Sequence, residues 1–348
     1  MKKFLIAAIA TTVASTAHAG SLNLDLRADY NSTTYTDSSQ KDFTKFYFKT
    51  GRLDYQGKAN DDLSFRVRLA FNKEATRLNT DSAQTAVEYA FLTHKMSEYF
   101  SLSAGRFNTE FGGFEGATSG ADLYLTSQFY TRKGPNGNLA AGVFGTADLL
   151  YMTGVKGTFT FGDHSIHVLG TNEKFKEAAT PMDQNQSMYG AIWRGAFMEK
   201  ALMTNLSYHT MNGPADGDTN QFVAAGVMWN SKPVMVSVDY LMSEFKEDAS
   251  GDKDTVTSIV AKFAYSGWEQ WTPRLEVVSS EEKLETAGTV TNKFMGYGAV
   301  LEYKPYTDVN FRYHLAYNYQ KEELDAGGDD PVSQEIVLGA RLMADFLK

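Results

Sequence analysis

The sequence predicts an all-β fold, a 16-stranded antiparallel transmembrane β-barrel with short periplasmic turns and long extracellular loops. Three observations predict it. Apolar and polar residues alternate along most of the chain, short connections alternate with long polar ones, and aromatic residues gather beside the short connections. Alternation with a period of two gives each strand one face for lipid and one for water, as a membrane barrel requires.

The composition is compatible with this fold and excludes several others. The 348 residues include no cysteine, 22% are charged and 43% are hydrophobic, so neither a disordered chain nor a disulfide scaffold is expected. The formal net charge of −9 argues against a nucleic-acid partner, because phosphates require a basic face. A mean hydropathy of −0.35 argues against a helical membrane protein but not against a barrel with a polar lumen.

The first nineteen residues have the pattern of a cleaved secretory signal. Lys2 and Lys3 precede an apolar stretch, Phe4–Val13, and a small-x-small cleavage site, Ala17-His18-Ala19. An N-terminal core helix is the alternative, and the terminal lysines disfavour it. We therefore expect a signal peptide at 1–19 and a single barrel at 20–348. No later segment offers about 18 uncharged apolar residues, so no transmembrane helix is predicted.

The mature chain opens on a clear strand pattern, with Leu22, Leu24 and Leu26 on one face and polar residues between them. The same alternation predicts the other strands, although Phe43–Tyr55, Phe100–Phe107 and Phe222–Trp229 are less regular. In chain order the predicted strands are Leu22–Tyr30, Phe43–Tyr55, Leu63–Phe71, Val87–Phe91, Phe100–Phe107, Val155–Phe161, Ile166–Gly170, Tyr189–Phe197, Leu202–Tyr208, Phe222–Trp229, Val234–Tyr240, Ile259–Tyr265, Pro273–Val277, Tyr297–Tyr303, Val309–Gln320 and Ile336–Phe346.

Connections of two lengths follow one another strictly. Short ones are predicted at 57–62, 95–99, 162–163, 198–200, 230–233, 267–270 and 304–308. Long polar ones are predicted near 31–42, 72–84, 108–148, 171–186, 211–220, 244–255, 280–293 and 321–333. Since every tight turn then lies on one side, the pattern is that of an outer-membrane barrel.

Aromatic residues favour this interpretation over a secreted β-sandwich or propeller. Tyr55, Tyr99, Phe161, Phe197, Trp229, Tyr265, Trp268, Trp271, Tyr303, Tyr306 and Phe346 all lie at or beside the short-turn ends. A soluble fold would place its aromatics toward strand middles, whereas a membrane interface selects a ring of them at one level.

A stretch that leaves the fifth strand resembles a known family. Gly105-Arg106-Phe107 and Phe111-Gly112 match a Gly-Arg/Gln-Phe…Phe-Gly pattern at the entrance to the longest loop. With residues 52–71 and 87–116, this stretch resembles the porin superfamily, most of all the phosphate-selective porin O and P type. The sequence departs from the family at Glu110, where a proline is usual, and at its Phe346-Leu347-Lys348 end, where a terminal aromatic is usual.

The resemblance implies an outer-membrane porin that passes small hydrophilic solutes and ions by passive diffusion, as a homotrimer. The alternatives are an anion- or phosphate-selective porin and a plugged structural or adhesive barrel. The expected partners are outer-membrane lipids and solutes. No catalytic motif, no metal-ligand series and no cofactor-binding pattern is found, so neither an enzyme nor a cofactor is expected.

Basic residues on the polar faces are the predicted pore lining. Alternation turns Arg27, Arg66, Arg68, Lys156, Arg194, Lys262, Arg274, Arg312 and Arg341 away from lipid, and Arg52 and Arg106 are added from less regular strands. A charge at the lipid-facing midplane costs about 2–4 kcal/mol, whereas in a wet lumen it sets the field along the pore. The alternative is that these residues only keep the wall hydrated and paired.

The loop at 108–148, with 41 residues, is far longer than the others. The resemblance implies that this third loop folds inward and narrows the pore, and the alternative is an extracellular lid. Its charged residues are Glu110, Glu115, Asp122, Arg132 and Lys133. We hypothesise that its carboxylates face Arg66 and Arg68, with help from Arg106, and create a transverse field. The late loops are acidic, which predicts an anionic rim.

Overall fold

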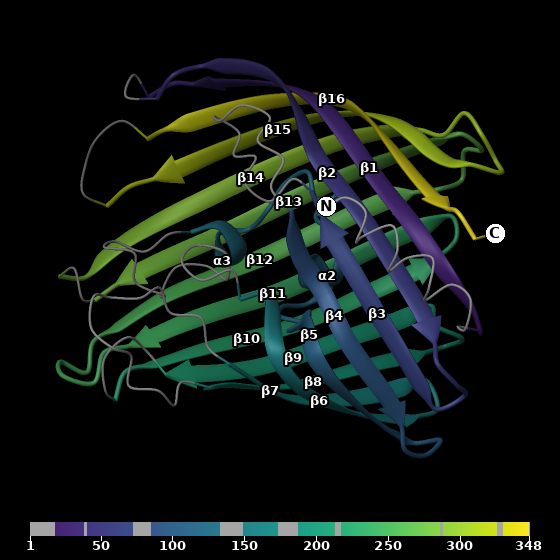
Figure 1. Ribbon diagram of the computed structural model, residues 1–348. Coiled ribbons are helices and arrows are strands. Elements are labelled where there is room, and N and C mark those ends of the chain that lie inside the picture. Colours follow the sequence, from purple (N-terminus) through teal and green to yellow (C-terminus); the bar gives the residue numbers. More distant parts are fainter. Residues whose placement is uncertain are drawn as a thin grey trace, which may run out of the picture.

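Sixteen antiparallel strands close into a barrel in the computed structural model, with β1 paired to β16 (Figure 1). The structure describes residues 18–37, 40–71, 85–132, 149–172, 187–212, 217–285, 288–325 and 330–347. Every strand pairs with its neighbours in sequence, so the predicted up-and-down barrel is confirmed. Among the described residues, no helix has the length and apolar character needed to cross a membrane.

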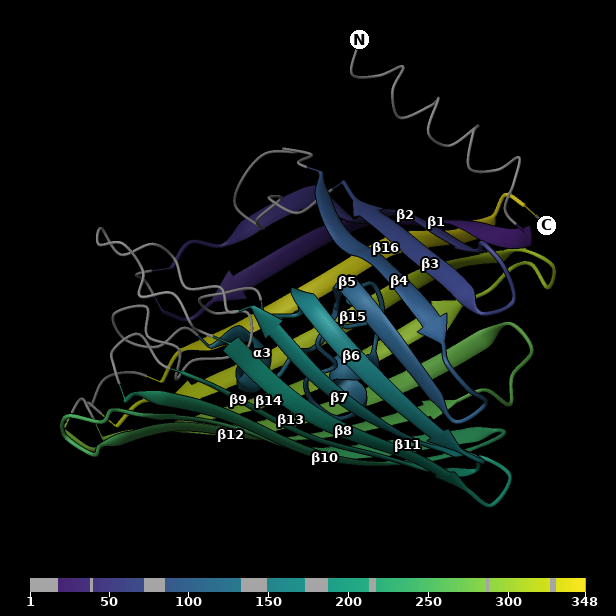
Figure 2. The same cartoon turned by 60° about the horizontal axis from the view of Figure 1, so that its bottom comes forward.

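The strands differ in length around the barrel: β3 to β9 have 8 to 11 residues each, and the other strands have 13 to 18. Figure 2 shows the side of the barrel on which β3 to β8 lie. Their bounds are β1 His18–Tyr35, β2 Phe43–Lys58, β3 Leu63–Ala70, β4 Ala86–Lys95, β5 Phe100–Asn108, β6 Tyr151–Phe161, β7 His164–Asn172, β8 Ser187–Phe197, β9 Leu202–Asn212, β10 Thr219–Ser231, β11 Val234–Lys246, β12 Lys253–Tyr265, β13 Trp271–Leu284, β14 Val290–Tyr303, β15 Asn310–Glu323 and β16 Val332–Asp345.

Several strands extend farther toward the extracellular side than the sequence predicts. β13 runs to Leu284 and β14 begins at Val290, so most of the predicted loop at 280–293 is strand. The predicted loops at 244–255 and 321–333 shorten in the same way. These extensions carry charged side chains on the outward face, so the alternation of apolar and polar residues stops although backbone pairing continues.

The outward face of the strands is apolar and exposed. Val67, Leu92 and Leu338 are 40%, 64% and 54% exposed, a burial pattern that fits contact with lipid. Tyr99, Trp229, Trp268, Tyr306 and Phe346 are exposed at the tight-turn end, where an aromatic girdle is predicted. The outer surface therefore has the two features expected of a membrane barrel.

The first part of the third loop lies inside the barrel. Two short helices, α2 Phe114–Ala117 and α3 Gln128–Thr131, are enclosed by the strands (Figure 1). Phe111, Leu125, Phe129 and Tyr130 are buried there against inward-facing apolar residues of the wall. Those wall residues are Met152, Leu169, Met188, Ile192, Met211, Phe222, Ala224, Leu241, Val260 and Val278.

This inner core explains why the predicted strand at Phe222–Trp229 looks irregular in the sequence. Phe222 and Ala224 face inward but are apolar, because the loop and not water covers them. The apolar side chains of the loop thus pack against β6 to β13. A cavity remains on another side, bordered by residues of β1 to β4 and by Arg341 and Met343 of β16.

Candidate functional site

Wall side chains bind the backbone of the loop at its first turn. Asp239 on β11 accepts hydrogen bonds from the N–H groups of Phe114 and Glu115 at 2.8 and 2.7 Å. Asn205 donates to the carbonyl oxygen of Gly113 at 3.1 Å, and His209 lies 2.8 Å from that of Thr109. These contacts hold α2 against β9 to β11.

Two glycines make room for Asp239. A Cβ atom added to Gly113 on the loop would lie 2.1 Å from Asp239 Oδ1, and one added to Gly226 on β10 would lie 2.2 Å away. Neither position therefore accepts a side chain while the carboxyl group stays in place. The close contact between wall and loop therefore depends on these three residues.

The second half of the described loop is held in the same way. Glu276 accepts from the N–H of Leu125 at 3.2 Å, and Asn318 donates to the carbonyl oxygen of Tyr124 at 2.9 Å. Arg27 donates to the carbonyl oxygen of Ala121 at 2.7 Å. Because the wall contacts come from β1 and from strands between β9 and β15, the loop is fixed around most of the barrel.

Asp122 is the loop carboxylate that lies between two arginines of the wall. It pairs with Arg312, and its Oδ1 lies 2.6 Å from Nη1 of Arg341 on β16. Burial opposes ionisation of Asp122, but the charges of Arg312 and Arg341 outweigh it and lower its pKa to about 2. The group is therefore ionised at neutral pH and fixed against β15 and β16.

Glu110 and Glu115 face other parts of the wall. Glu110 lies 2.6 Å from Nζ of Lys156 and 3.1 Å from Arg194, and despite its burial these charges lower its pKa. Glu115 is buried and accepts hydrogen bonds from the N–H and hydroxyl of Ser127 at 2.9 and 2.6 Å. Burial raises its pKa.

Arg132 ends the described part of the loop on the extracellular side. It forms ion pairs with Glu282 at 2.6 Å and Glu322 at 3.1 Å. Lys133, the other basic residue predicted in the loop, lies outside the described residues.

A cationic cluster covers the inner face of β2 and β3. Arg66 and Arg68 both pair with Asp54, at 2.6 and 2.7 Å, and Arg52 pairs with Glu88 at 2.9 Å. The guanidinium groups of Arg66 and Arg68 lie 4.3 and 4.5 Å from the ring centroid of Tyr89, within the range of cation–π attraction.

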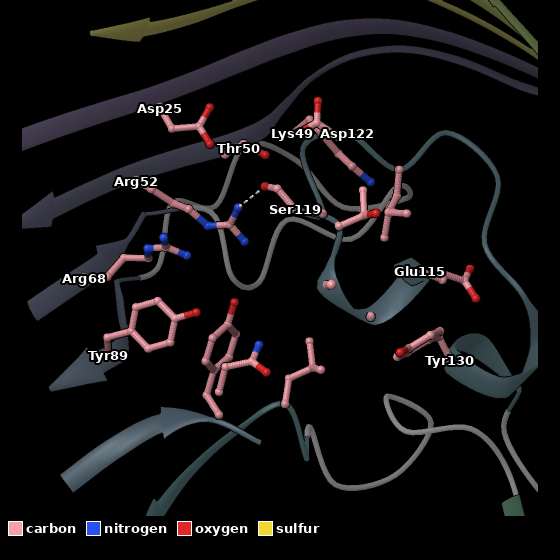
Figure 3. Close-up of a pocket in the computed structure, with 18 of the residues that line it drawn as sticks. Asp25, Lys49, Thr50, Arg52, Arg68, Tyr89, Glu115, Ser119, Asp122 and Tyr130 are labelled. Atoms are coloured by element: carbon pink, nitrogen blue, oxygen red, sulfur yellow. Dashed lines mark hydrogen bonds between the residues drawn. The ribbon is translucent and has the colours of Figure 1, made fainter. Parts of the chain in front are cut away.

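A cavity of about 500 Å³ separates this cluster from the loop (Figure 3). Arg52, Arg68 and Tyr89 border one side of it, and residues 116–120 of the loop border the other. Arg52 reaches across to Ser119, whose hydroxyl accepts a hydrogen bond at 3.2 Å (Figure 3). Lys49, Asp25, Asp122 and Arg341 line the same space.

The other predicted lining residues lie on the inner face, and the arginines among them and Lys156 are paired there. Arg27 is buried beside Asp29 at 2.9 Å, and Arg274 lies 3.0 Å from Glu276 and 3.2 Å from Glu302. Lys262 is buried near the loop. The sequence thus identified the face of these residues, whereas their pairing follows from the fold.

Arg106 does not line the lumen, contrary to the prediction from the sequence. It pairs in register with Ala90 and Thr153, and all three share the outward face with the exposed residues Leu102 and Ala104. Its Nε donates to the carbonyl oxygen of Val87 at 2.7 Å. Arg106 lies near the loop end of β5, beyond the apolar band, so an outward-facing charge there costs little free energy.

The hypothesis that loop carboxylates face Arg66 and Arg68 is also wrong. Glu110, Glu115 and Asp122 are engaged elsewhere, and the two arginines pair with Asp54 of the wall instead. The sequence analysis did not identify Asp54, although Asp54 is two residues from Arg52 on the same strand and therefore shares its face. Among the described residues, no three histidine or acidic side chains are grouped as a metal site would require.

The fold and the inner loop together define a class of protein: a porin, a water-filled barrel narrowed by its third loop. The sequence matches the family model "Phosphate-selective porin O and P" over residues 21–268, and the chain belongs to this family. It is an outer-membrane porin of the Gram-negative type, through which small hydrophilic solutes and ions diffuse passively.

Solved structures share the fold at low sequence identity. The anion-selective porin from Comamonas acidovorans is 11% identical with a TM-score of 0.66, over 93% of this chain and 99% of that one. The outer membrane channel DcaP of Acinetobacter baumannii is 15% identical with a TM-score of 0.63, over 95% and 98%. The trimer form of OmpT from Vibrio cholerae is 15% identical with a TM-score of 0.60, over 94% and 100%. A comparison with curated protein sequences found no match.

Proposed function

We propose that this porin prefers small anions, and that they pass the third loop through the cavity between residues 116–122 and the wall formed by β2 to β4. The observation that carries the proposal is an imbalance of charge across this cavity. The wall of β2 to β4 supplies Lys49, Arg52, Arg66 and Arg68 against the acids Asp54 and Glu88. The facing residues 116–120 carry no charge, and the lining acids Asp25 and Asp122 are both paired with Arg341.

The placement of the loop carboxylates supports the same preference. Glu110 is paired with Lys156 and Arg194, and Asp122 is held between two arginines. Glu115 borders the cavity but is buried and hydrogen-bonded to Ser127. None of the three neutralises Arg52 or Arg68 across the cavity. In a narrow lumen with a low-dielectric wall, a net positive face of this kind concentrates anions and repels cations.

Ion selectivity in a planar bilayer tests this proposal. Wild-type channels in a KCl gradient should give a reversal potential on the anion-selective side. Arg52→Ala combined with Arg68→Ala should shift it toward cations and raise conductance, because two long cationic side chains leave the cavity. The shift should shrink at high salt, since the Debye length falls from about 10 Å at 0.1 M to about 3 Å at 1 M.

The matched control keeps the charge at the same positions. Arg52→Lys combined with Arg68→Lys should retain the wild-type sign of selectivity. A wild-type preference for cations, or an alanine double variant with the wild-type reversal potential at both salt concentrations, would overturn the proposal. A folded barrel without conductance would identify it as a plugged structural or adhesive barrel instead.

We also propose that the protein works as a channel without catalysing a reaction, that it assembles as a homotrimer, and that residues 1–19 are removed on export. The trimer form of OmpT, which shares the fold, supports the second point. The mass of the purified complex in detergent tests the oligomeric state, and a single-chain mass would contradict a trimer. Mass spectrometry of the mature chain tests cleavage after Ala19, with Gly20 as the expected first residue.

A further inference from the structure

The outward face of the late strands changes character near its extracellular end. On β14 the outward residues from Met295 to Tyr303 include Tyr297 and Leu301 and carry no charge, but the next outward residue toward the loop is Lys293. β13 changes likewise to Glu281 and Lys283, and β15 to Lys321 and Glu323. The paired sheet therefore rises beyond its apolar band and presents charges outward, not toward the lumen.

Apart from Arg106 on β5, the outward charges at this end lie on one side of the barrel. Outward lysines at the extracellular ends of β11 to β15 are Lys246, Lys253, Lys283, Lys293 and Lys321. On β7 to β10 the described outward positions at the same ends carry no charged residue. Lys246 and Lys253 are directly opposite each other in register, and Nζ of Lys253 lies 3.1 Å from the carboxylate of Glu244.

A groove of about 160 Å³ lies at the boundary between the charged residues and the apolar band. Ser279, Glu281, Lys293, Met295, Lys321 and Glu323 line it. Lys293 is paired in register with Glu281 on one side and Glu323 on the other. Nζ of Lys321 lies 2.9 Å from carboxylate oxygens of both Glu323 and Asp330. The tyrosine rings of Tyr297 and Tyr319, 6.4 Å apart, continue the outer face toward the membrane.

We propose that this groove binds the phosphate-bearing headgroup of an outer-leaflet lipid. The ammonium groups of Lys293 and Lys321 and the hydroxyl of Ser279 supply donors for phosphate oxygens. The carboxylates of Glu281 and Glu323 supply hard oxygen ligands, so that a divalent cation bridges them to the same phosphate. The acyl chains then lie along the apolar residues below.

The position of the groove along the membrane normal also matches that of a lipid headgroup. A phosphorylated headgroup lies directly above the hydrocarbon, and the groove lies where the apolar band of β13 to β15 ends. A soluble anion approaching the pore would instead meet inward-facing residues. The mixture of lysine and glutamate also fits a phosphate with its counter-cation better than it fits a bare anion.

Binding of bisphosphorylated lipid A to the full barrel in detergent tests the proposal by native mass spectrometry. Lys293→Ala combined with Lys321→Ala should reduce the lipid-bound fraction at least several-fold. Dephosphorylated lipid A should bind the wild type as weakly as bisphosphorylated lipid A binds the variant. Chelation of divalent cations should weaken binding to the wild type, and Glu281→Gln combined with Glu323→Gln should remove that sensitivity.

The control removes the same charge at the opposite rim. Lys200→Ala combined with Lys304→Ala, at the tight-turn end, should leave lipid binding unchanged, because both lysines lie at the periplasmic surface. An unchanged bound fraction in the groove variant, or an equal loss in the control, overturns the proposal. If inorganic phosphate at millimolar concentration competes fully with the lipid, the groove is a free-phosphate site and the lipid assignment is wrong.

Discussion

The carboxyl group of Asp239 on β11 accepts a hydrogen bond from the backbone N–H of Glu115 on the inner loop, with a nitrogen-to-oxygen distance of 2.7 Å. A second oxygen of the same group binds the N–H of Phe114. One wall residue thus sets the position of α2, which borders the cavity opposite Arg52 and Arg68. The width of the passage therefore depends on a residue that does not line it.

Asp239→Ala should loosen this part of the loop. Two hydrogen bonds to a carboxyl group are lost, each contributing roughly 1.5–3 kcal/mol, and α2 is no longer held against β11. We expect larger and noisier single-channel currents and a lower unfolding temperature. Asp163→Ala, at an exposed tight turn, is the control and should behave as wild type. Currents of wild-type size and noise in Asp239→Ala would mean that the remaining contacts fix the loop without it.

Asp54→Asn should make the channel more anion-selective. Asp54 is the shared partner of Arg66 and Arg68, and removing its charge leaves both guanidinium groups less compensated beside the cavity. The reversal potential in a KCl gradient should move opposite to that of the Arg52→Ala and Arg68→Ala double variant. Asp163→Asn serves as a control for loss of one acid, and a shift toward cations in Asp54→Asn would contradict the assigned path.

Asp122 gives a prediction for acid pH. Its pKa is lowered from 3.8 to about 2, so the ionised form is favoured in the folded state. The linked stability, about 2 kcal/mol, is present above pH 3.8 and is lost as the pH falls toward 2. Asp122→Asn should therefore lower the unfolding temperature at pH 7, and this difference should disappear below pH 2. A difference that persists at pH 1.5 would show that packing, not charge, accounts for it.

The two faces of β3 can be tested by a pair of substitutions. Val67 faces outward and is 40% exposed, whereas Ser64 shares the inward face with Arg66 and Arg68. Val67→Arg places a charge in hydrocarbon at a cost of about 2–4 kcal/mol and should impair assembly, measured as heat-modifiable barrel in outer membranes. Ser64→Arg should assemble normally. Equal assembly of the two variants would invalidate the assignment of faces.

Orientation can be tested on intact cells. A protease-accessible tag inserted after Gly251, in the β11–β12 connection, or after Gly217, before β10, should be cleaved from outside. A tag inserted at Asn60, in the tight β2–β3 turn, should be protected. Cleavage at Asn60 on intact cells would reverse the assignment of the two rims.

The sequence alone determined the barrel, because the period-two pattern records which face of each strand meets lipid. It placed Arg27, Arg274 and Arg341 on the inner face, and the Gly105-Arg106-Phe107 stretch identified the loop. That local pattern records only polarity, however. It does not distinguish an inward polar residue that faces water from one that binds the loop backbone, as Asp239 does.

Tertiary structure decided what the third loop touches and therefore where the passage lies. Phe111 and Phe129 pack against apolar residues of β10 to β12, so the loop lies on that side of the lumen. The cavity therefore lies beside Arg52 and Arg68. Asp122 could not be assigned to Arg341 from the sequence, because 219 residues separate them along the chain. Contacts of this kind form only when the barrel closes and the loop folds inside it. A local sequence pattern does not encode contacts between residues so far apart in the chain.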